Sequence, residues 1–325
     1  MVGTLHPRPT MSEDQEKLLT VMLDSRNAPQ ERAEAGRIIN LVPGGDPRPG
    51  VLDFNIPWGK VPAGKFTFGG DLNKNNLTTQ QIDLSYDYWI ALYPVTYAQY
   101  KQFIADNGYT EKHRDCWTDA GWQWKRDEIT PGVYWKDPHF DLPNHSVVGV
   151  TWYESYAFTQ WLNKQSLVIL PTAPTGYKLR LPTEAEWEKA ARYPDGRKFP
   201  WGNNYLSGYA NIDETWDEVG PHNLGRTAAV GIYPQGTQTE IGALDLAGNV
   251  WEWCLSKWVS EYQHPEDNTP EGDSPRSLRG GSWLYPQIRS RAEYRKSNTL
   301  FHRLNVPFYS LIDLGFRLVF APAPC

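Results

Sequence analysis

The chain has 325 residues, a formal net charge of −6 and a sequence pI near 5.7, and 14% of its residues are aromatic. This length suits one large irregular domain with a short extension and argues against a second full domain. The negative net charge excludes a general nucleic-acid or membrane-surface binder, because such proteins need an attractive positive field. No run of 18 apolar residues and no signal-peptide pattern is visible in the sequence, so we expect a soluble, cytoplasmic protein.

The cysteines and histidines do not form a common catalytic or metal-binding motif. The three cysteines, Cys116, Cys254 and Cys325, are too few and too scattered for a disulfide framework or a thiolate metal site. The seven histidines are dispersed along the chain, and GxSxG, HExxH and glycine-rich phosphate-loop motifs are absent. The sequence motifs therefore indicate none of the common hydrolase or nucleotide-binding chemistries.

The first 50 residues differ in composition from the rest of the chain. Residues 12–42 carry Leu, Ala and Ile at helical spacing around a proline break, which predicts a helical hairpin. The GGDPRPG segment at 44–50 would end a helix, so we expect a hairpin and connector at 1–50 and a main domain at 51–325. Because so short a helix pair cannot bury its own core, it must dock on the main domain or belong to an array outside this chain.

Beyond residue 51 the predicted strands and helices alternate. Residues 61–69 and 82–91 alternate apolar with polar or small residues, which predicts two strands that pair within one sheet. Residues 95–107 and 151–163 carry aromatic residues three and four apart, which predicts amphipathic helices. These two helices have candidate N-caps at Thr96 and Thr151.

A third helix should begin at the PTEAE sequence of 182–186. Thr183 would be its N-cap, and Glu186 stands three residues later, where each side chain can bond the free backbone N–H of the other. We also expect the Trp residues as a group to pack in the core, because large rings bury well and this chain has 15 of them.

Eight short motifs stand in a fixed order over about residues 54–321. They are VPAGKF at 61–66, YPVT at 93–96, VGVTW at 148–152, RLPTEAEWE at 180–188, PWG at 200–202, LAGNVWEW at 246–253, RGGSW at 279–283 and GFR at 315–317. In this order they resemble the formylglycine-generating enzyme family, also called sulfatase-modifying factors. The resemblance implies an α+β, irregular and loop-rich fold that is a variant of the C-type lectin fold.

The resemblance also shows which chemistry this chain lacks. In the oxidases of the family a copper-binding cysteine pair follows the GGSW motif, and the matching positions here are Tyr285 and Ser290. Neither side chain is a soft ligand such as the thiolate that holds Cu(I). The iron-dependent sulfoxide synthases of the family need a histidine cluster from an added N-terminal domain, and residues 12–42 contain no histidine. We therefore expect no copper and no enzymatic activity.

The resemblance implies a structural calcium ion in the turn of the GNVWEW motif. By match its ligands would be the carbonyl oxygens of Ala247, Gly248 and Val250 and the carboxylate of Glu252. These are hard oxygen ligands, which calcium requires. The alternative is that Glu252 only caps or pairs with a neighbouring residue.

Residues 284–313 carry the most unusual sequence of the chain, rich in Tyr, Phe, Leu and Ser. This segment resembles the variable proteins of diversity-generating retroelements, in which a C-type-lectin-like fold displays a ligand surface. Rigid aromatic side chains supply contact area at little entropic cost, and Ser supplies adaptable hydrogen bonds. The candidate ligand-binding residues are Leu284, Tyr285, Gln287, Tyr294, Ser297, Leu300, Phe301, Tyr309, Ser310 and Asp313.

The charge of the C-terminal part is opposite to that of the whole chain. Residues 276–320 contain eight Arg and Lys against two acids, a local excess of +6, which favours an anionic partner. The alternative is that Arg279, Arg289 and Arg317 pair internally with the acids of the third helix.

The main hypothesis is a non-catalytic ligand-binding protein, a variable protein that displays 284–313 to a protein or small-molecule ligand. The first alternative is an enzyme of the formylglycine-generating family with a non-copper mechanism, which would use the same surface as its substrate groove. A structural accessory domain is the second alternative. The N-terminal hairpin and connector resemble segments of bacterial multidomain ATPases from conflict systems, so we expect it to join or dock on other modules.

Overall fold

The structure is a computed structural model that describes residues 11–70, 79–131, 133–261, 264–298 and 312–324. Within these ranges the α-helices are α1 (Glu13–Leu23), α2 (Pro29–Ile38), α3 (Tyr97–Ala105), α4 (Asp119–Lys125), α5 (Trp152–Lys164) and α6 (Glu184–Arg192). The short 3-10 helices are η1 (Ile39–Leu41), η2 (Glu111–Cys116), η3 (Val133–Lys136), η4 (Pro234–Gly236) and η5 (Gln287–Ser290). The strands are β1 (Trp58–Val61), β2 (Gly64–Phe68), β3 (Gln80–Leu84), β4 (Tyr88–Ala91), β5 (Tyr177–Arg180), β6 (Trp251–Lys257), β7 (Arg276–Arg279), β8 (Lys296–Asn298), β9 (Leu314–Gly315) and β10 (Val319–Pro322).

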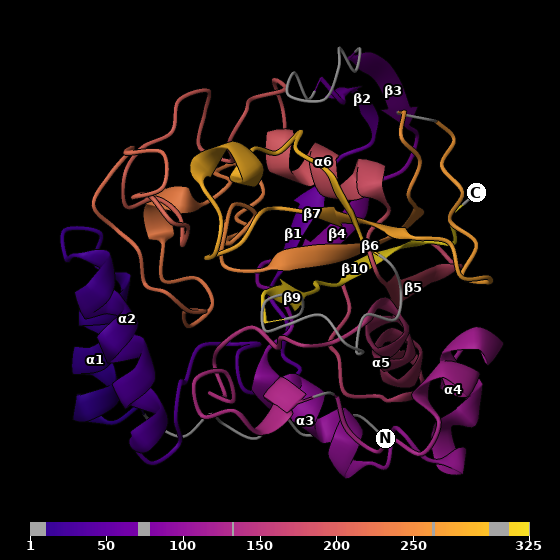
Figure 1. The fold of residues 1–325 in the computed structure, drawn as a ribbon, viewed down its shortest axis with the longest axis horizontal. Helices are drawn as coiled ribbons and strands as arrows, with labels where there is room; N and C mark the ends of the chain where they lie inside the picture. Colours follow the sequence, from indigo (N-terminus) through magenta and orange to yellow (C-terminus); the bar gives the residue numbers. More distant parts are fainter. Residues whose placement is uncertain (1–10, 71–78, 132, 262–263, 299–311, 325) are drawn as a thin grey trace.

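These strands form sheets with the orders β1-β4-β10-β5, β2-β3 and β8-β7-β6-β9 in the described part of the chain. The pairs are antiparallel except for β6 and β9, which run parallel. Figure 1 shows α6 on one side of the central strands and α3, α4 and α5 on the other. Helix α6 packs on β2, β6 and β7, and α5 packs on β5. The fold is thus α+β, as the sequence predicts.

Each strand predicted at the start of the main domain is divided in two. The segment 61–69 breaks at Pro62, which has no N–H for a sheet ladder, so β1 and β2 separate. The segment 82–91 is also divided, between β3 and β4, although no proline stands there. The predicted pairing is correct, but it is distributed over two sheets, because β2 pairs with β3 and β1 pairs with β4. The backbone N–H of Ala63 donates to the Asp87 carboxylate at 2.8 Å and ties the two breaks together.

The three predicted helix starts are confirmed with their caps. Thr96, Thr151 and Thr183 each accept a hydrogen bond from the backbone N–H three residues later, and that later side chain bonds back to the cap. Each cap of this kind contributes about 1 kcal/mol to helix stability. The caps fix where α3, α5 and α6 begin, and α6 carries the acids that support the candidate site.

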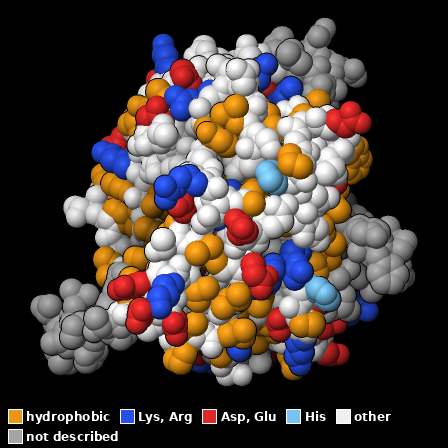
Figure 2. Space-filling view, turned by 90° about the vertical axis from the view of Figure 1, so that its left-hand side faces the viewer, with side chains coloured by type: hydrophobic (Ala, Val, Ile, Leu, Met, Phe, Trp, Pro, Cys, Tyr) orange, Lys and Arg blue, Asp and Glu red, His pale blue; other side chains and the backbone are white. Residues whose placement is uncertain are grey.

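The N-terminal hairpin docks on the main domain, where it lies beside the loops that follow α6 (Figure 1). Met22 and Ala33 pack in one cluster with Ala229 and Ile232. At Gly36 a Cβ atom would lie 2.9 Å from the Ala229 side chain, so glycine permits this close approach. Figure 2 views this side of the molecule, where hydrophobic, basic and acidic side chains are interspersed. Among the exposed hydrophobic residues of the hairpin region are Val21, Leu23, Ile38 and Leu41.

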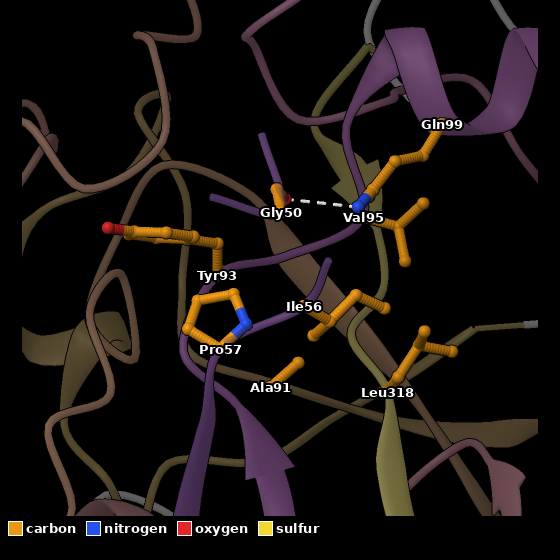
Figure 3. A pocket seen from close by; sticks show the side chains of 8 residues that line it. All are labelled: Gly50, Ile56, Pro57, Ala91, Tyr93, Val95, Gln99 and Leu318. Carbon is orange, nitrogen blue, oxygen red and sulfur yellow. Dashed lines mark hydrogen bonds between the residues drawn. The ribbon is translucent and has the colours of Figure 1, made fainter. Parts of the chain in front are cut away.

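The Gly/Pro connector is packed against the main domain. Arg48 and Asp46 form a buried ion pair at 2.7 Å, and Arg48 also donates to the Val230 carbonyl at 2.7 Å. The side chain of Gln99 donates to the Gly50 carbonyl at 3.0 Å beside a small apolar pocket (Figure 3). The glycines and prolines of the connector thus let the chain turn, while hydrogen bonds from Arg48 and Gln99 hold the connector to the main domain.

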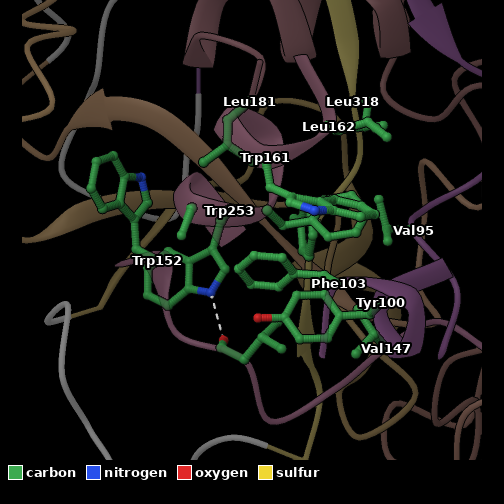
Figure 4. Packing of buried hydrophobic residues seen from close by; sticks show 14 of the residues in the cluster. Val95, Tyr100, Phe103, Val147, Trp152, Trp161, Leu162, Leu181, Trp253 and Leu318 are labelled. Atoms are coloured by element: carbon green, nitrogen blue, oxygen red, sulfur yellow. Dashed lines mark hydrogen bonds between the residues drawn. The ribbon is translucent and has the colours of Figure 1, made fainter. Parts of the chain in front are cut away.

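The core is built from aromatic rings, as the composition predicts. Tyr100, Phe103 and Trp161 pack together below the sheets, and Trp253 donates to the Val150 carbonyl at 3.0 Å (Figure 4). The Trp side chains with the least solvent exposure are Trp152, Trp161, Trp187, Trp251 and Trp253. None of the helices in the described ranges is long and apolar enough to cross a membrane.

Candidate functional site

The candidate site begins at a glycine turn that follows β7. Gly280 and Gly281 have φ angles of 96° and 74°, in the left-handed region that favours glycine. A Cβ atom on Gly281 would lie 2.8 Å from the Arg289 carbonyl oxygen, so this turn packs directly against η5. The GGSW motif therefore places residues 284–290 at a defined position next to the sheet.

Buried ion pairs support this turn from below. Arg279, the last residue of β7, donates to Glu184 at 2.9 Å and to Glu188 at 2.6 Å. Arg295 donates to Glu184 at 2.6 Å, and Arg192 donates to Glu188 at 2.7 Å. Each carboxylate thus has two guanidinium partners, which compensates the cost of burying these charges on α6.

These contacts revise the interpretation of the C-terminal charge excess. Arg279, Arg295 and Arg317 are buried in carboxylate pairs, and Arg276 is buried with its guanidinium 3.9 Å from the centre of the Trp152 ring. Internal pairing is thus confirmed for Arg279 with the acids of α6, whereas Arg317 pairs with Glu252 of β6. Much of the +6 excess is consequently internal charge.

Four aromatic side chains meet beside the glycine turn, and we call them the Tyr285 cluster. Tyr285 packs on Trp216 with ring centres 6.5 Å apart and on Trp251 with ring centres 5.9 Å apart. Trp251 in turn packs on Tyr294, also at 5.9 Å. Trp251 is fully buried, Tyr285 and Tyr294 are half-buried, and Trp216 is 59% exposed. The cluster therefore runs from the core to the surface.

Two cations lie against this cluster. The Arg289 guanidinium is 4.4 Å from the centre of the Tyr285 ring and forms no ion pair with the acids of α6, so the internal-pairing alternative does not hold for Arg289. The Lys296 ammonium lies 5.1 Å from the Tyr285 ring and 5.3 Å from the Trp251 ring. Burial lowers the pKa of Lys296, and the neighbouring Arg289 lowers it further, whereas Asp313 opposes this shift.

The predicted ligand-binding residues lie at different depths. Leu284, Tyr285, Gln287, Tyr294 and Ser297 are half-buried. Asp313, another of the predicted ligand-binding residues, is only 2% exposed, so its carboxylate does not lie on the surface. Its carboxylate accepts a hydrogen bond from the Ser282 hydroxyl at 2.6 Å, and burial raises its pKa. The remaining candidates lie outside the described residues: Leu300, Phe301, Tyr309 and Ser310.

Sequence reasoning missed Trp216 as a member of this site, and it considered Arg289 and Lys296 only as part of the C-terminal charge excess. Trp216 lies in the acid-rich stretch DETWDE, and a large ring in so polar a segment is the signal that could have marked it. Trp251 was assigned to the core, where it lies, but its ring also supports Tyr285.

The side chains at the positions matched to the copper cysteines do not fit a copper ion. Tyr285 is packed among rings and cations, and Ser290 is buried with its hydroxyl donating to the Gln287 carbonyl at 2.8 Å. Cys116 and Cys254 are buried free thiols whose pKa values are raised by burial. Within the described ranges, no group of three or more His, Cys, Asp or Glu side chains could hold a metal ion.

The Glu252 side chain does not fit the implied calcium site. Its carboxylate accepts from Arg317 through two N–H groups at 2.7 Å each and from the Trp187 indole at 2.7 Å. A guanidinium thus occupies the place where a cation would bind, and the local-pairing alternative describes Glu252 better. Calcium binding by the carbonyl oxygens of Ala247, Gly248 and Val250 stays a prediction.

The mixed sheets, the capped α6 and the glycine turn define a fold of the formylglycine-generating type. The family model for the sulfatase-modifying factor enzyme 1-like domain matches residues 60–322, and the chain belongs to this family. The formylglycine-generating enzyme of Thermomonospora curvata is 29% identical over 81% of this chain and 92% of its own length. A hercynine oxygenase of Mycolicibacterium thermoresistibile is 30% identical over 84% of this chain and 61% of its own length.

The family includes inactive members as well as enzymes. The inactive C-alpha-formylglycine-generating enzyme 2 of Mus musculus is 27% identical over 79% of this chain and 83% of its own length. Among solved structures, PvdO from Pseudomonas aeruginosa has a TM-score of 0.60 at 22% identity, covering 84% of this chain and 99% of its own. Treponema denticola variable protein 1 has a TM-score of 0.52 at 22% identity, covering 82% of this chain and 95% of its own. Its similarity shows that a variable protein shares this fold.

Proposed function

We propose that this chain is a non-catalytic ligand-binding protein that displays residues 284–313 on its lectin-like scaffold, as a variable protein of a diversity-generating retroelement does. The observation that carries the proposal is the replacement of the copper-binding cysteine pair. Tyr285 stands at the first position within an aromatic cluster, and Ser290 stands at the second with its hydroxyl bonded internally. Neither position offers a thiolate for Cu(I).

The buried ion pairs beneath the turn before residue 284 favour a ligand-display function. The turn before residue 284 is held by the Arg279 pairs with Glu184 and Glu188, which are buried beneath it. A surface whose framework lies in buried pairs can change its outer side chains without losing the fold. The half-buried Gln287 and Ser297 are side chains of this kind.

The N-terminal hairpin supports a role within a larger cytoplasmic assembly. It packs on the main domain through Met22 and Ala33 and leaves Leu41 84% exposed. An exposed large apolar side chain on a docked element suits contact with a further module. In this proposal the hairpin joins the display domain to such modules.

A copper and oxidation assay tests the non-catalytic part of the proposal. We expect the chain neither to bind Cu(I) stoichiometrically nor to oxidise a cysteine-containing peptide under air with a reductant. The formylglycine-generating enzyme of Thermomonospora curvata serves as the positive control. Stoichiometric Cu(I) binding, or formation of formylglycine by the purified chain, would refute the proposal.

A further inference from the structure

The exposed Trp216 belongs to a loop that is firmly anchored. This segment, residues 213–220, we call the Trp216 loop. The carboxylate of Glu214 is fully buried and accepts from the Tyr205 hydroxyl at 2.7 Å, the Ser207 hydroxyl at 2.7 Å and the Gly208 N–H at 2.6 Å. The backbone N–H of Asp213 also donates to the Tyr285 carbonyl at 3.0 Å. At the other end of the loop the backbone N–H of Val219 donates to the Glu214 carbonyl at 3.0 Å, so the indole is presented without a large ordering cost on binding.

The two cations beside Tyr285 form no ion pair in the described residues. Neither Arg289 nor Lys296 lies within ion-pair distance of a carboxylate in the described part of the chain. The Asp213 carboxylate accepts from Thr215 instead, and the Asp313 carboxylate accepts from Ser282. The exposed Trp216 packs on Tyr285, and two cations without an ion-pair partner lie over the Tyr285 ring, so this surface complements a ligand with carboxylates next to apolar groups.

We propose that the Trp216 loop, Tyr285, Arg289 and Lys296 form a binding surface for an acidic peptide segment of a partner protein. Asp or Glu side chains of the peptide would meet the two cations, and an apolar neighbour would pack on Trp216. The inference rests on the proposed display function and names the class of ligand. It adds Trp216, which lies outside the displayed segment, as a contact that determines specificity.

The position of Lys296 in the sheet favours a peptide over an acidic sugar. Lys296 is the first residue of β8, and β8 is the outermost strand of its sheet in the described part of the chain. An extended peptide can add to such an edge through its main chain, while its side chains reach pockets on either side. A sugar has no main chain of this kind, so the edge strand gives it no corresponding advantage.

The test pans a phage-displayed library of random peptides against the full chain. We expect the enriched peptides to carry an excess of Asp and Glu. Their affinity should fall several-fold as the salt concentration rises from about 50 to about 500 mM. Arg289→Gln, Lys296→Gln and Trp216→Ala should each weaken binding by about tenfold or more. Lys178→Gln, which removes an exposed cation from β5, should leave affinity unchanged.

Several outcomes would overturn the inference. Enriched peptides without an acidic excess, no enrichment at all, or binding that survives both charge variants would each do so. Binding of immobilised acidic sugars in place of peptides would overturn the peptide assignment and leave the display function standing. The copper and oxidation assay is independent of these results, so failure of the proposed function is recognised separately. Thermal unfolding of each variant confirms that the fold is kept.

Discussion

Replacing Glu252 with Gln separates the two roles considered for this residue. Glu252 is fully buried in β6, and its carboxylate bonds Arg317 twice and Trp187 once, all at 2.7 Å. Glu252→Gln keeps the shape but leaves the Arg317 guanidinium buried without a counter-charge. Breaking a buried pair in this way costs about 3–5 kcal/mol of unfolding free energy. At about 2 °C per kcal/mol for a chain of this size, the Tm should fall by about 6–10 °C.

The assay is thermal unfolding followed by circular dichroism, with excess calcium and with a chelator. The matched control is Glu240→Gln, which breaks an exposed pair with Arg197 at 3.1 Å and should cost less than about 1 kcal/mol. We expect the large loss for Glu252→Gln in both conditions. A variant as stable as the wild type would refute the ion-pair account. A Tm that rises with calcium in the wild type but not in this variant would show that Glu252 is a calcium ligand after all.

Three further predictions follow from buried contacts. Arg32→Ala removes donors to the Gly208 and Ile232 carbonyls, so it should lower the unfolding free energy by about 2–4 kcal/mol and speed hydrogen exchange around Gly208. The control Glu34→Gln on the same helix should change neither quantity. Burial and the nearby Glu184 raise the pKa of Glu266 from its usual 4.5 to about 8, so its protonated form stabilises the fold below pH 4.5 and that stability is lost as the pH rises through 8. As the pH rises from 5 to 8, the unfolding free energy of Glu266→Gln in urea should therefore gain about 2 kcal/mol over that of the wild type, a value reduced because the side chain is partly in contact with solvent. A difference between the two proteins that stays constant over this pH range would contradict the pKa shift. Gly281→Ala should cost about 3 kcal/mol or more, because its left-handed backbone and the Arg289 carbonyl leave no room for a Cβ, and a neutral result would contradict this packing.

Local signals gave the most accurate sequence predictions. The cap at Thr183 could be predicted because its partner Glu186 is three residues away and the interaction needs no tertiary contact. The division of the 61–69 strand was missed, although Pro62 was visible, because alternation of side chains continues across the break. The docking of the hairpin could be stated only as one of two options, since it depends on loops near residue 229 that lie far along the chain.

Only the part of the candidate site that lies next to a sequence motif could be predicted. Tyr285 and Tyr294 follow the recognisable GGSW motif, so their neighbourhood could be inferred from the sequence. Trp216 reaches the cluster from a distant loop, and no periodicity connects it with Tyr285. The charge count misled because it treats Arg279 and Arg289 alike, whereas one is buried between two carboxylates and the other lies against a ring. Burial decides which charges face a partner, and composition does not record it.

Sequencing near-identical copies of the gene tests the display function most directly. The proposal predicts that the copies differ almost only within 284–313, at positions such as Tyr285, Gln287 and Ser297, and match a template repeat beside a reverse transcriptase gene. The supporting residues Glu184 and Arg279 should be the same in every copy, because they hold the framework beneath the surface. Uniform copies, or differences spread evenly along the chain, would contradict the display function.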